Sequence, residues 1–390
     1  MPNLKRPREA RTLLELLIWE RNQTFEEFVE FANEFARTKG EPGRLSSRHL
    51  ARLAAGRGDR GRPLGRPLPA TARLLERIFG VGLPELLAPN AAPISPVPPA
   101  DPELRQLFRT SAKVDQFVLK LLQDQLGATR RLDRQLGALA TRDEVHAKAA
   151  QVERFLQFSV TPSVRDSLAA LVSELFALSG WQALDTGNIA EAWQQYTRAR
   201  SAAAECGDPA YVAHSAAGQA FVLVELGDTE IAIKLLGEMR KHVGTRTSRL
   251  MRSWLAAAHG EVLAAGGRRD DSMRAFDRAQ AVLPGETSPE SGPYVVLDRV
   301  HLGRWRGHAL ARVGEPEAVD VLASSLDRLD PTFTRAETGL RVDLATALAA
   351  SGEQEAAQHH AAHAERLAAE IGSVRQRRRV QSLVARKLRA

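Results

Sequence analysis

The chain has 390 residues, a net charge of +7 and 44% apolar residues, enough for two or three domains with cores of their own. No stretch reaches the roughly 18 uninterrupted apolar residues of a membrane-spanning helix, and the first residues lack the apolar core of a signal peptide. We therefore expect a cytoplasmic protein with no membrane partner. The single cysteine, Cys206, excludes an internal disulfide framework.

Positive charge is concentrated at the two ends of the sequence. Residues 1–90 hold 16 Lys or Arg against 11 Asp or Glu, and residues 375–390 hold seven basic residues and no acidic one. Between Arg44 and Arg77 there are nine arginines against two acidic residues. Such a local excess favours a polyanionic partner over a small acidic substrate.

Residues 11–87 read as five short helices. The segment from Thr24 to Glu27 is a capping box that opens the second helix. Ser46 or Ser47 can cap the third helix, and Gly56 ends it. The remaining two helices follow a basic loop. A small helical domain is therefore expected at the N-terminus.

The third helix has two contrasting faces. At 100° per residue, Leu50, Leu53 and Ala54 lie on one side. Arg48 and Arg52 lie on the other side, four residues apart, so both guanidinium groups can reach the same surface. We expect the apolar face to anchor the helix and the arginines to face a partner.

A helix docked by its N-terminus into a major groove would place Ser47 and Arg48 nearest the base edges, where arginine bonds guanine through two hydrogen bonds. Flanking arginines would hold phosphates without reading sequence. The expected DNA-binding residues are Arg44, Ser47, Arg48, Arg52, Arg57, Arg60, Arg62 and Arg66. The alternative is a solvated basic face on a small protein-interaction domain.

A proline-rich segment at residues 89–102 marks a domain boundary, because its six prolines favour an extended linker. Residues 103–160 then read as connecting helices. The first of them is expected to be a long amphipathic helix over Glu103 to Leu126, and Thr141 begins a second capping box.

Five glycines punctuate the C-terminal half at separations of 40, 40, 47 and 38 residues. They are Gly187, Gly227, Gly267, Gly314 and Gly352. A small residue lies seven positions before each glycine, and Tyr196, Leu236 and Phe276 lie nine positions after the first three. Small residues let antiparallel helices approach closely, and the larger residue fills the gap. The pattern predicts a solenoid of stacked helix pairs.

Residues 163–372 resemble tetratricopeptide repeats, with a period longer than the usual 34 residues. Residues 11–88 resemble the helix-turn-helix domain of Cro/CI-type (XRE) transcription factors, although the loop from Thr38 to Leu45 is longer than the family's turn. We therefore expect an all-α chain in five parts: a helix-turn-helix domain (1–88), a linker (89–102), connecting helices (103–160), tetratricopeptide-like repeats (161–374) and a basic C-terminal capping helix (375–390).

The combination resembles a class of bacterial transcriptional regulators, some of which bind a signalling peptide. The resemblance implies a homodimer that binds double-stranded DNA and whose repeats receive a peptide, small molecule or protein ligand. By the same resemblance, inward positions of each repeat's first helix would line the ligand groove. These positions are Trp181, Phe221, Trp254, Glu261, Arg304 and His308. Each is also a residue type common in packing or solvated positions.

Standard catalytic and metal signatures are missing: the sequence has no Walker A loop, no G-x-S-x-G, no H-E-x-x-H and no spaced cysteine pair. We expect no enzyme, cofactor or metal. His359, His360 and His363 lack a distant further ligand and are typical of a solvated helix.

The basic residues from Arg375 onward are expected to cap the solenoid with a polar outer face, the alternative being a second nucleic-acid contact. The main alternative for the whole chain is a scaffold or anti-regulator that binds proteins and never touches DNA.

Overall fold

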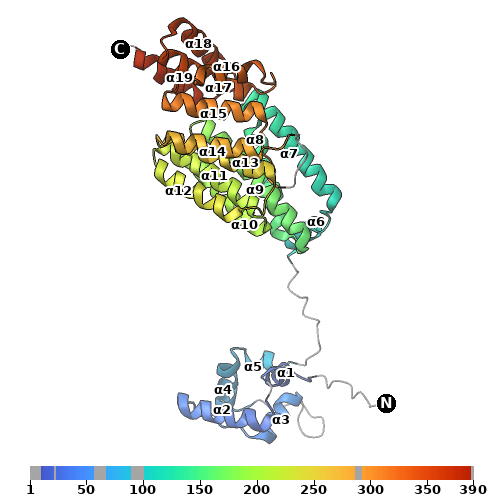
Figure 1. Cartoon of the computed structure of the whole chain (residues 1–390). Helices are drawn as coiled ribbons and strands as arrows, with labels where there is room; N and C mark the ends of the chain where they lie inside the picture. The colour runs from blue at the N-terminus through green and yellow to red at the C-terminus, as the bar shows by residue number, and fades with distance from the viewer. Residues whose placement is uncertain (1–9, 22, 57–66, 89–100, 286–291, 388–390) are drawn as a thin grey trace. The chain divides into compact units, whose positions relative to one another are not determined.

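The computed structural model describes residues 10–21, 23–56, 67–88, 101–285 and 292–387. Over these ranges the chain is all-helical, with nineteen helices and no strand (Figure 1). It divides into two compact units, Met1–Pro102 and Glu103–Ala390. The segment expected to be a linker lies almost entirely outside the described residues.

The first unit is built from five short helices. They are α1 (Leu13–Glu20), α2 (Phe25–Lys39), α3 (Ser47–Ala55), α4 (Pro69–Phe79) and α5 (Leu83–Leu86). The capping box at Thr24 is confirmed, because the Glu27 backbone N–H donates to the Thr24 hydroxyl and the Glu27 carboxylate accepts from the Thr24 backbone. α2 continues to Lys39 and ends at Gly40, so the loop expected to begin at Thr38 begins two residues later.

The second unit opens with three helices, continues with five consecutive helix pairs and ends with one more helix. The three are α6 (Pro102–Ser111), α7 (Gln116–Leu136) and α8 (Ala138–Phe158). The pairs are α9 (Pro162–Asp185) with α10 (Ile189–Cys206), α11 (Pro209–Leu226) with α12 (Thr229–Val243), α13 (Arg249–Ala265) with α14 (Arg269–Val282), α15 (Arg299–Val313) with α16 (Ala318–Asp327), and α17 (Thr334–Ala350) with α18 (Gln354–Glu370). The last helix is α19 (Val374–Lys387).

The recurring glycines turn the chain between the helices of each pair, as the sequence predicts. Their φ angles are 79°, 89°, 72°, 79° and 85° in chain order. This left-handed conformation is costly for a residue with a Cβ atom, and glycine adopts it freely. The five-fold repetition of the turn is confirmed.

Close helix approach within a pair depends on a small residue opposite a large one. A Cβ atom added to Gly180 would lie 2.9 Å from the Tyr196 ring, and one added to Gly260 would lie 2.8 Å from the Phe276 ring. In the fourth pair Leu322 lies against Gly307, although it stands eight positions after Gly314 and not nine as in the first three pairs.

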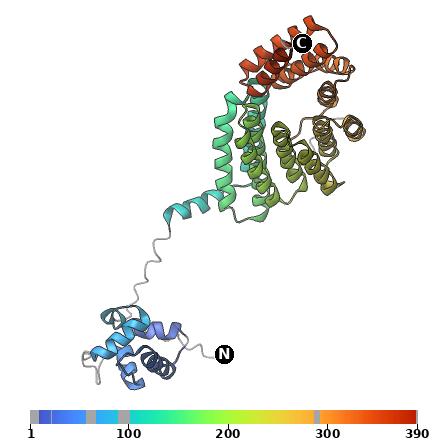
Figure 2. The same ribbon diagram turned by 90° about the vertical axis from the view of Figure 1, so that its left-hand side faces the viewer.

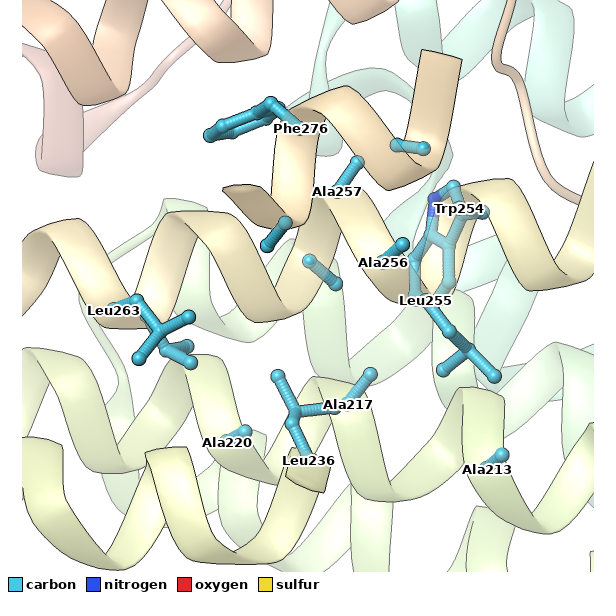
Figure 3. Close-up of a cluster of buried hydrophobic side chains, with 14 of the residues drawn as sticks. Ala213, Ala217, Ala220, Leu236, Trp254, Leu255, Ala256, Ala257, Leu263 and Phe276 are labelled. Carbon is cyan, nitrogen blue, oxygen red and sulfur yellow. The ribbon is translucent and has the colours of Figure 1, made fainter. Parts of the chain in front are cut away.

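The core between successive pairs follows the same rule. Figure 3 shows Ala213, Ala217 and Ala220 lying along α11, with larger side chains such as Leu236 of α12 and Leu263 of α13 around them. Because the alanines occupy little space, α11 and α13 pack closely and their facing surfaces are excluded from water.

The last helices of this unit pack against its first ones. α17 contacts α7, and α19 contacts α9. Figure 2 shows the red C-terminal part of this unit next to one end of its teal helices. The sequence predicted a solenoid with an extended surface, whereas the observed array curves until its two ends meet.

Two expectations for residues 103–160 are wrong. The helix expected from Glu103 to Leu126 is broken between α6 and α7, where Asp115 accepts a hydrogen bond from the Val118 N–H and caps α7. α8 begins before Thr141, whose hydroxyl caps nothing and instead donates to the buried Asp133 carboxylate at 3.2 Å. A buried carboxylate that needs donors outweighs the local capping preference.

Within the described residues, one helix is long and apolar enough to cross a membrane by length and composition. It is α9, and 72% of its apolar window is buried inside the unit. A helix that is apolar on all sides is typical of the centre of a helical core.

Candidate functional sites

The face predicted on α3 is present in the first unit. Leu50, Leu53 and Ala54 are buried, and Arg48 and Arg52 are exposed on the opposite side. The amphipathic pattern of this helix is therefore confirmed.

Both ends of α3 are attached to the rest of the first unit. Before the helix, Asn33 of α2 donates to the Leu45 carbonyl and accepts from the Leu45 N–H, each at 2.9 Å. At its other end, the Thr12 hydroxyl donates to the Ala54 carbonyl at 2.7 Å. Sequence reasoning missed Asn33 and Thr12, because nothing in the local pattern links them to α3. These bonds fix where the exposed arginines are presented.

The structure describes four of the eight residues expected at DNA. Arg44, Arg48 and Arg52 are exposed. Ser47 is the first residue of α3, and Ser46 is the cap that accepts from the backbone of His49. The other four residues, Arg57, Arg60, Arg62 and Arg66, lie outside the described residues.

In the first unit, exposed acidic side chains gather on α2 and exposed basic side chains on and just before α3. Four exposed glutamates follow α2 at helical spacing: Glu26, Glu27, Glu30 and Glu34. On α3, partial burial and, to a lesser extent, the charge of Arg52 lower the pKa of His49. A polyanion would therefore be attracted to the α3 side and repelled from this side of α2.

The second candidate site is formed by the first helices of successive pairs together with the last helix, α19. It contains a chain of charged side chains from four helices. His308 of α15 lies 2.8 Å from a Glu261 oxygen of α13 and 2.6 Å from an Asp343 oxygen of α17. Arg379 of α19 donates to the same Asp343 oxygen at 2.5 Å. The sequence predicted Glu261 and His308 here but missed Asp343 and Arg379.

The protonation states of this chain follow from burial and pairing. Burial alone lowers the pKa of His308, but Asp343 and Glu261 outweigh it, so the pKa is raised. Burial likewise opposes ionisation of Asp343, yet His308 and Arg379 hold its pKa far below the usual range. Burial lowers the pKa of the neighbouring Arg304. An imidazolium that donates from both ring nitrogens therefore links the two carboxylates.

The predicted aromatic residues form a separate cluster. Trp254 of α13 and Phe221 of α11 both lie against Trp305 of α15, with ring centroids 6.0 and 6.2 Å apart. His214 lies 5.0 Å from the Trp254 ring, and burial, with the nearby Arg130 charge, lowers its pKa to about 4. The sequence analysis missed Trp305, because counting positions back from Gly314 selected the adjacent residue, Arg304.

Trp181, the remaining predicted groove residue, lies apart from both groups. The Arg375 guanidinium of α19 lies 5.8 Å from the Trp181 ring centroid and pairs with Glu225 of α11 at 2.6 Å. The expectation that the basic C-terminal residues form a polar outer face is therefore wrong for Arg375 and Arg379. Both arginines form ion pairs with carboxylates of other helices, Arg375 with Glu225 and Arg379 with Asp343.

The segment before α15 reaches back to the first helices of the unit. The Tyr294 N–H donates to Glu174 of α9 at 2.6 Å, and Arg134 of α7 donates to the Tyr294 hydroxyl at 2.8 Å. The Arg130 guanidinium lies 4.3 Å from the Tyr294 ring centroid. These contacts join the segment before α15 to α7 and α9.

The sequence matches no protein-family model and no curated protein.

Proposed function

We propose that this chain is a DNA-binding transcriptional regulator. Its first unit resembles a Cro/CI-type helix-turn-helix domain, with α3 as the recognition helix, and its second unit is a tetratricopeptide-like array that receives a signal and mediates dimerisation. The observation that carries the proposal is α3 itself, a short helix held at both ends that presents Arg48 and Arg52 on one exposed face beside Arg44.

A recognition helix must keep a fixed register against the duplex, since contacts to base edges tolerate little displacement. The paired bonds from Asn33 and the bond from Thr12 supply that rigidity. The exposed glutamates of α2 would repel DNA and so favour its approach at α3. Positive charge at Arg44, Arg48 and Arg52 would release counterions from the phosphate backbone.

A feature of α7 supports dimerisation. Phe117, Leu121, Leu132 and Leu136 are 70%, 46%, 45% and 49% exposed. They fall within about 100° of one another around the helix axis. This α7 stripe consists of two exposed apolar pairs with the polar Gln125 between them. Exposed apolar side chains on one face are typical of a surface that associates with another protein, and a two-fold dimer would present two α3 helices to a two-half-site operator.

The side of the second unit that carries the aromatic and charged clusters and Arg375, which we call its inner face, supports signal reception. It combines an aromatic cluster around Trp305 with a charged chain through His308, and such mixtures of apolar walls and a few convergent polar groups are typical of ligand sites. The same residues join successive helix pairs, so a ligand there would alter how the pairs pack.

The proposal is tested by selecting double-stranded DNA from a random pool with the full chain. We expect enrichment of a two-half-site sequence by the wild-type chain and none by the R48A/R52A variant. A matched control, R37A/R73A, removes the same charge from exposed positions on α2 and α4 and should still enrich the sequence. Failure of the wild-type chain to enrich any sequence would contradict the proposal.

A further inference from the structure

A cleft of about 260 Å³ lies among α12, α13 and α14, formed by residues other than those of the charged and aromatic clusters. Three of its lining residues are Arg240 near the end of α12, Arg252 in α13 and Arg278 in α14. Apolar side chains, among them Leu255 and Val282, form much of the remaining wall. The cleft therefore combines three positive charges with an apolar surface.

None of its lining residues is acidic. Within the part of the chain that the structure describes, none of the three arginines forms an ion pair. Arg240 donates to the Nδ1 atom of His259 at 2.9 Å, and burial, with the charges of Arg240 and Arg278, lowers the pKa of that ring to about 4, so His259 is neutral and supplies no negative charge. This contrasts with the inner face, where Arg375 and Arg379 each meet a carboxylate.

Two of the positive charges, those of Arg240 and Arg252, are also partly removed from water. The Nε atom of Arg252 is buried and has no hydrogen-bond partner among the described residues. Burial and the charge of Arg278 lower the pKa of Arg240. Like charges held beside an apolar wall cost free energy that a bound anion would offset. The cleft is thus built to receive negative charge.

We propose that this cleft binds a small phosphate monoester, with the phosphate between Arg240, Arg252 and Arg278 and the organic part against Leu255 and Val282. A phosphate monoester carries close to two negative charges at neutral pH and three acceptor oxygens. The guanidinium fork matches those oxygens through paired hydrogen bonds. A single carboxylate would leave most of the positive charge uncompensated.

That this ligand acts as the signal rests on the proposed function. The binding test does not depend on that function, because it is made without DNA. A ligand here would contact two helix pairs at once, because α12 belongs to one pair and α13 and α14 to the next. It would therefore change the angle between those pairs.

The test is calorimetric titration of the full chain with phenyl phosphate. Phenyl sulfate, an isosteric monoanion, and inorganic phosphate, which lacks the apolar part, serve as comparison ligands. We expect phenyl phosphate to bind about tenfold more tightly than either, since it alone supplies both the second charge and the ring. No binding of phenyl phosphate, or equal binding of phenyl sulfate, overturns the proposal. A phosphotyrosine peptide that binds about tenfold more tightly than phenyl phosphate also overturns it, in favour of a protein ligand.

Arg278→Gln is the diagnostic variant, because this side chain is exposed and its loss opens no core. The control, Arg274→Gln, removes the same charge one turn earlier on α14, where the arginine pairs with Asp271. We expect R278Q to weaken phenyl phosphate binding about tenfold and R274Q to leave it unchanged.

Stability gives a second readout. R278Q should raise the melting temperature of the ligand-free chain, since it removes a like charge from beside Arg240, while R274Q should not. Equal effects of R278Q and R274Q on binding overturn the proposal. Phenyl phosphate binding that persists in a chain without DNA affinity would contradict the proposed function and leave this site intact.

Discussion

Arg335 of α17 and Asp133 of α7 lie 202 residues apart in the sequence and form a buried ion pair of 3.0 Å. Asp133 also accepts from Gln182 of α9 at 2.7 Å. Close by, Ser373, just before α19, donates to Asp185 at the end of α9 at 2.6 Å. These bonds join the last helices of the second unit to its first, so they hold the two ends of the array together.

Breaking this pair is expected to destabilise the second unit strongly. Arg335→Met leaves the Asp133 charge buried without its cation, which typically costs about 3–5 kcal/mol. Replacing Asp133 by Asn as well should restore part of the loss. Urea unfolding followed by tryptophan fluorescence measures both effects. As a control, Arg274→Met breaks the exposed pair with Asp271 and should cost less than about 1 kcal/mol. Equal costs for the two single variants would contradict the importance of the buried pair.

Two glycines within helices should respond to alanine with opposite signs. Gly260→Ala brings a Cβ atom to 2.8 Å from the Phe276 ring, so we expect a loss of about 1–3 kcal/mol. Gly127→Ala in α7 meets only the end of Arg131 at 3.8 Å and should stabilise the chain by about 0.5–1 kcal/mol. Thermal unfolding of both variants measures this. Stabilisation by Gly260→Ala would show that the close approach of α13 and α14 is not required.

Acid should destabilise the second unit through His214. Its pKa is about 4 in the folded chain, below the value of about 6.5 for an exposed histidine, so the unfolded chain binds its proton more readily. The corresponding stability is complete above pH 6.5 and is lost as the pH falls from 6.5 to 4, by up to about 3 kcal/mol. His214→Gln should flatten this part of the curve of unfolding free energy against pH. An unchanged curve would contradict the burial of a neutral ring.

His308 should contribute to the pH dependence of the unfolding free energy with the opposite sign. Its folded pKa is raised by the two carboxylates, so its stabilisation is complete below pH 6.5 and is lost as the pH rises through the folded pKa. His308→Gln should therefore cost more stability at pH 6 than at pH 9. A cost that is the same at both values would mean that the imidazolium does not link Glu261 and Asp343.

The α7 stripe is expected to hold the dimer. Substituting both Phe117 and Leu121 by Glu should convert the chain from a dimer to a monomer of 42.7 kDa in sedimentation equilibrium. Ile231→Glu, at a side chain of α12 that is 58% exposed, is the control and should leave the dimer intact. A wild-type monomer, or a dimer in the double variant, would rule out this interface.

The sequence predicted those features that repeat or that act locally. The turn at each recurring glycine, the contact of Tyr196 with Gly180 and the capping box at Thr24 all depend on residues within one helix or one helix pair. The burial of Leu50 and Leu53 follows from helical periodicity in the same way. Such relationships are fixed by short-range geometry.

The remaining features depend on contacts between distant segments. No periodicity relates Asp133 to Arg335, and the meeting of the array's ends follows from curvature accumulated over all its helix pairs. The same holds for Asn33, whose role appears only once α2 lies beside the segment that precedes α3. Trp305 shows a smaller error of the sequence analysis. Counting from the recurring glycines locates an inward-facing position only to within one residue.

The most direct test of the central claim is the salt dependence of affinity for the selected duplex, measured by fluorescence anisotropy between 50 and 200 mM salt. The logarithm of the binding constant should fall by about 0.9 per phosphate contact for each tenfold rise in salt concentration. We predict that the R48A/R52A variant binds at least about tenfold more weakly with an unchanged melting temperature, and that R37A/R73A binds like the wild type. Equal affinity and equal salt dependence of R48A/R52A and the wild type would contradict DNA binding by α3.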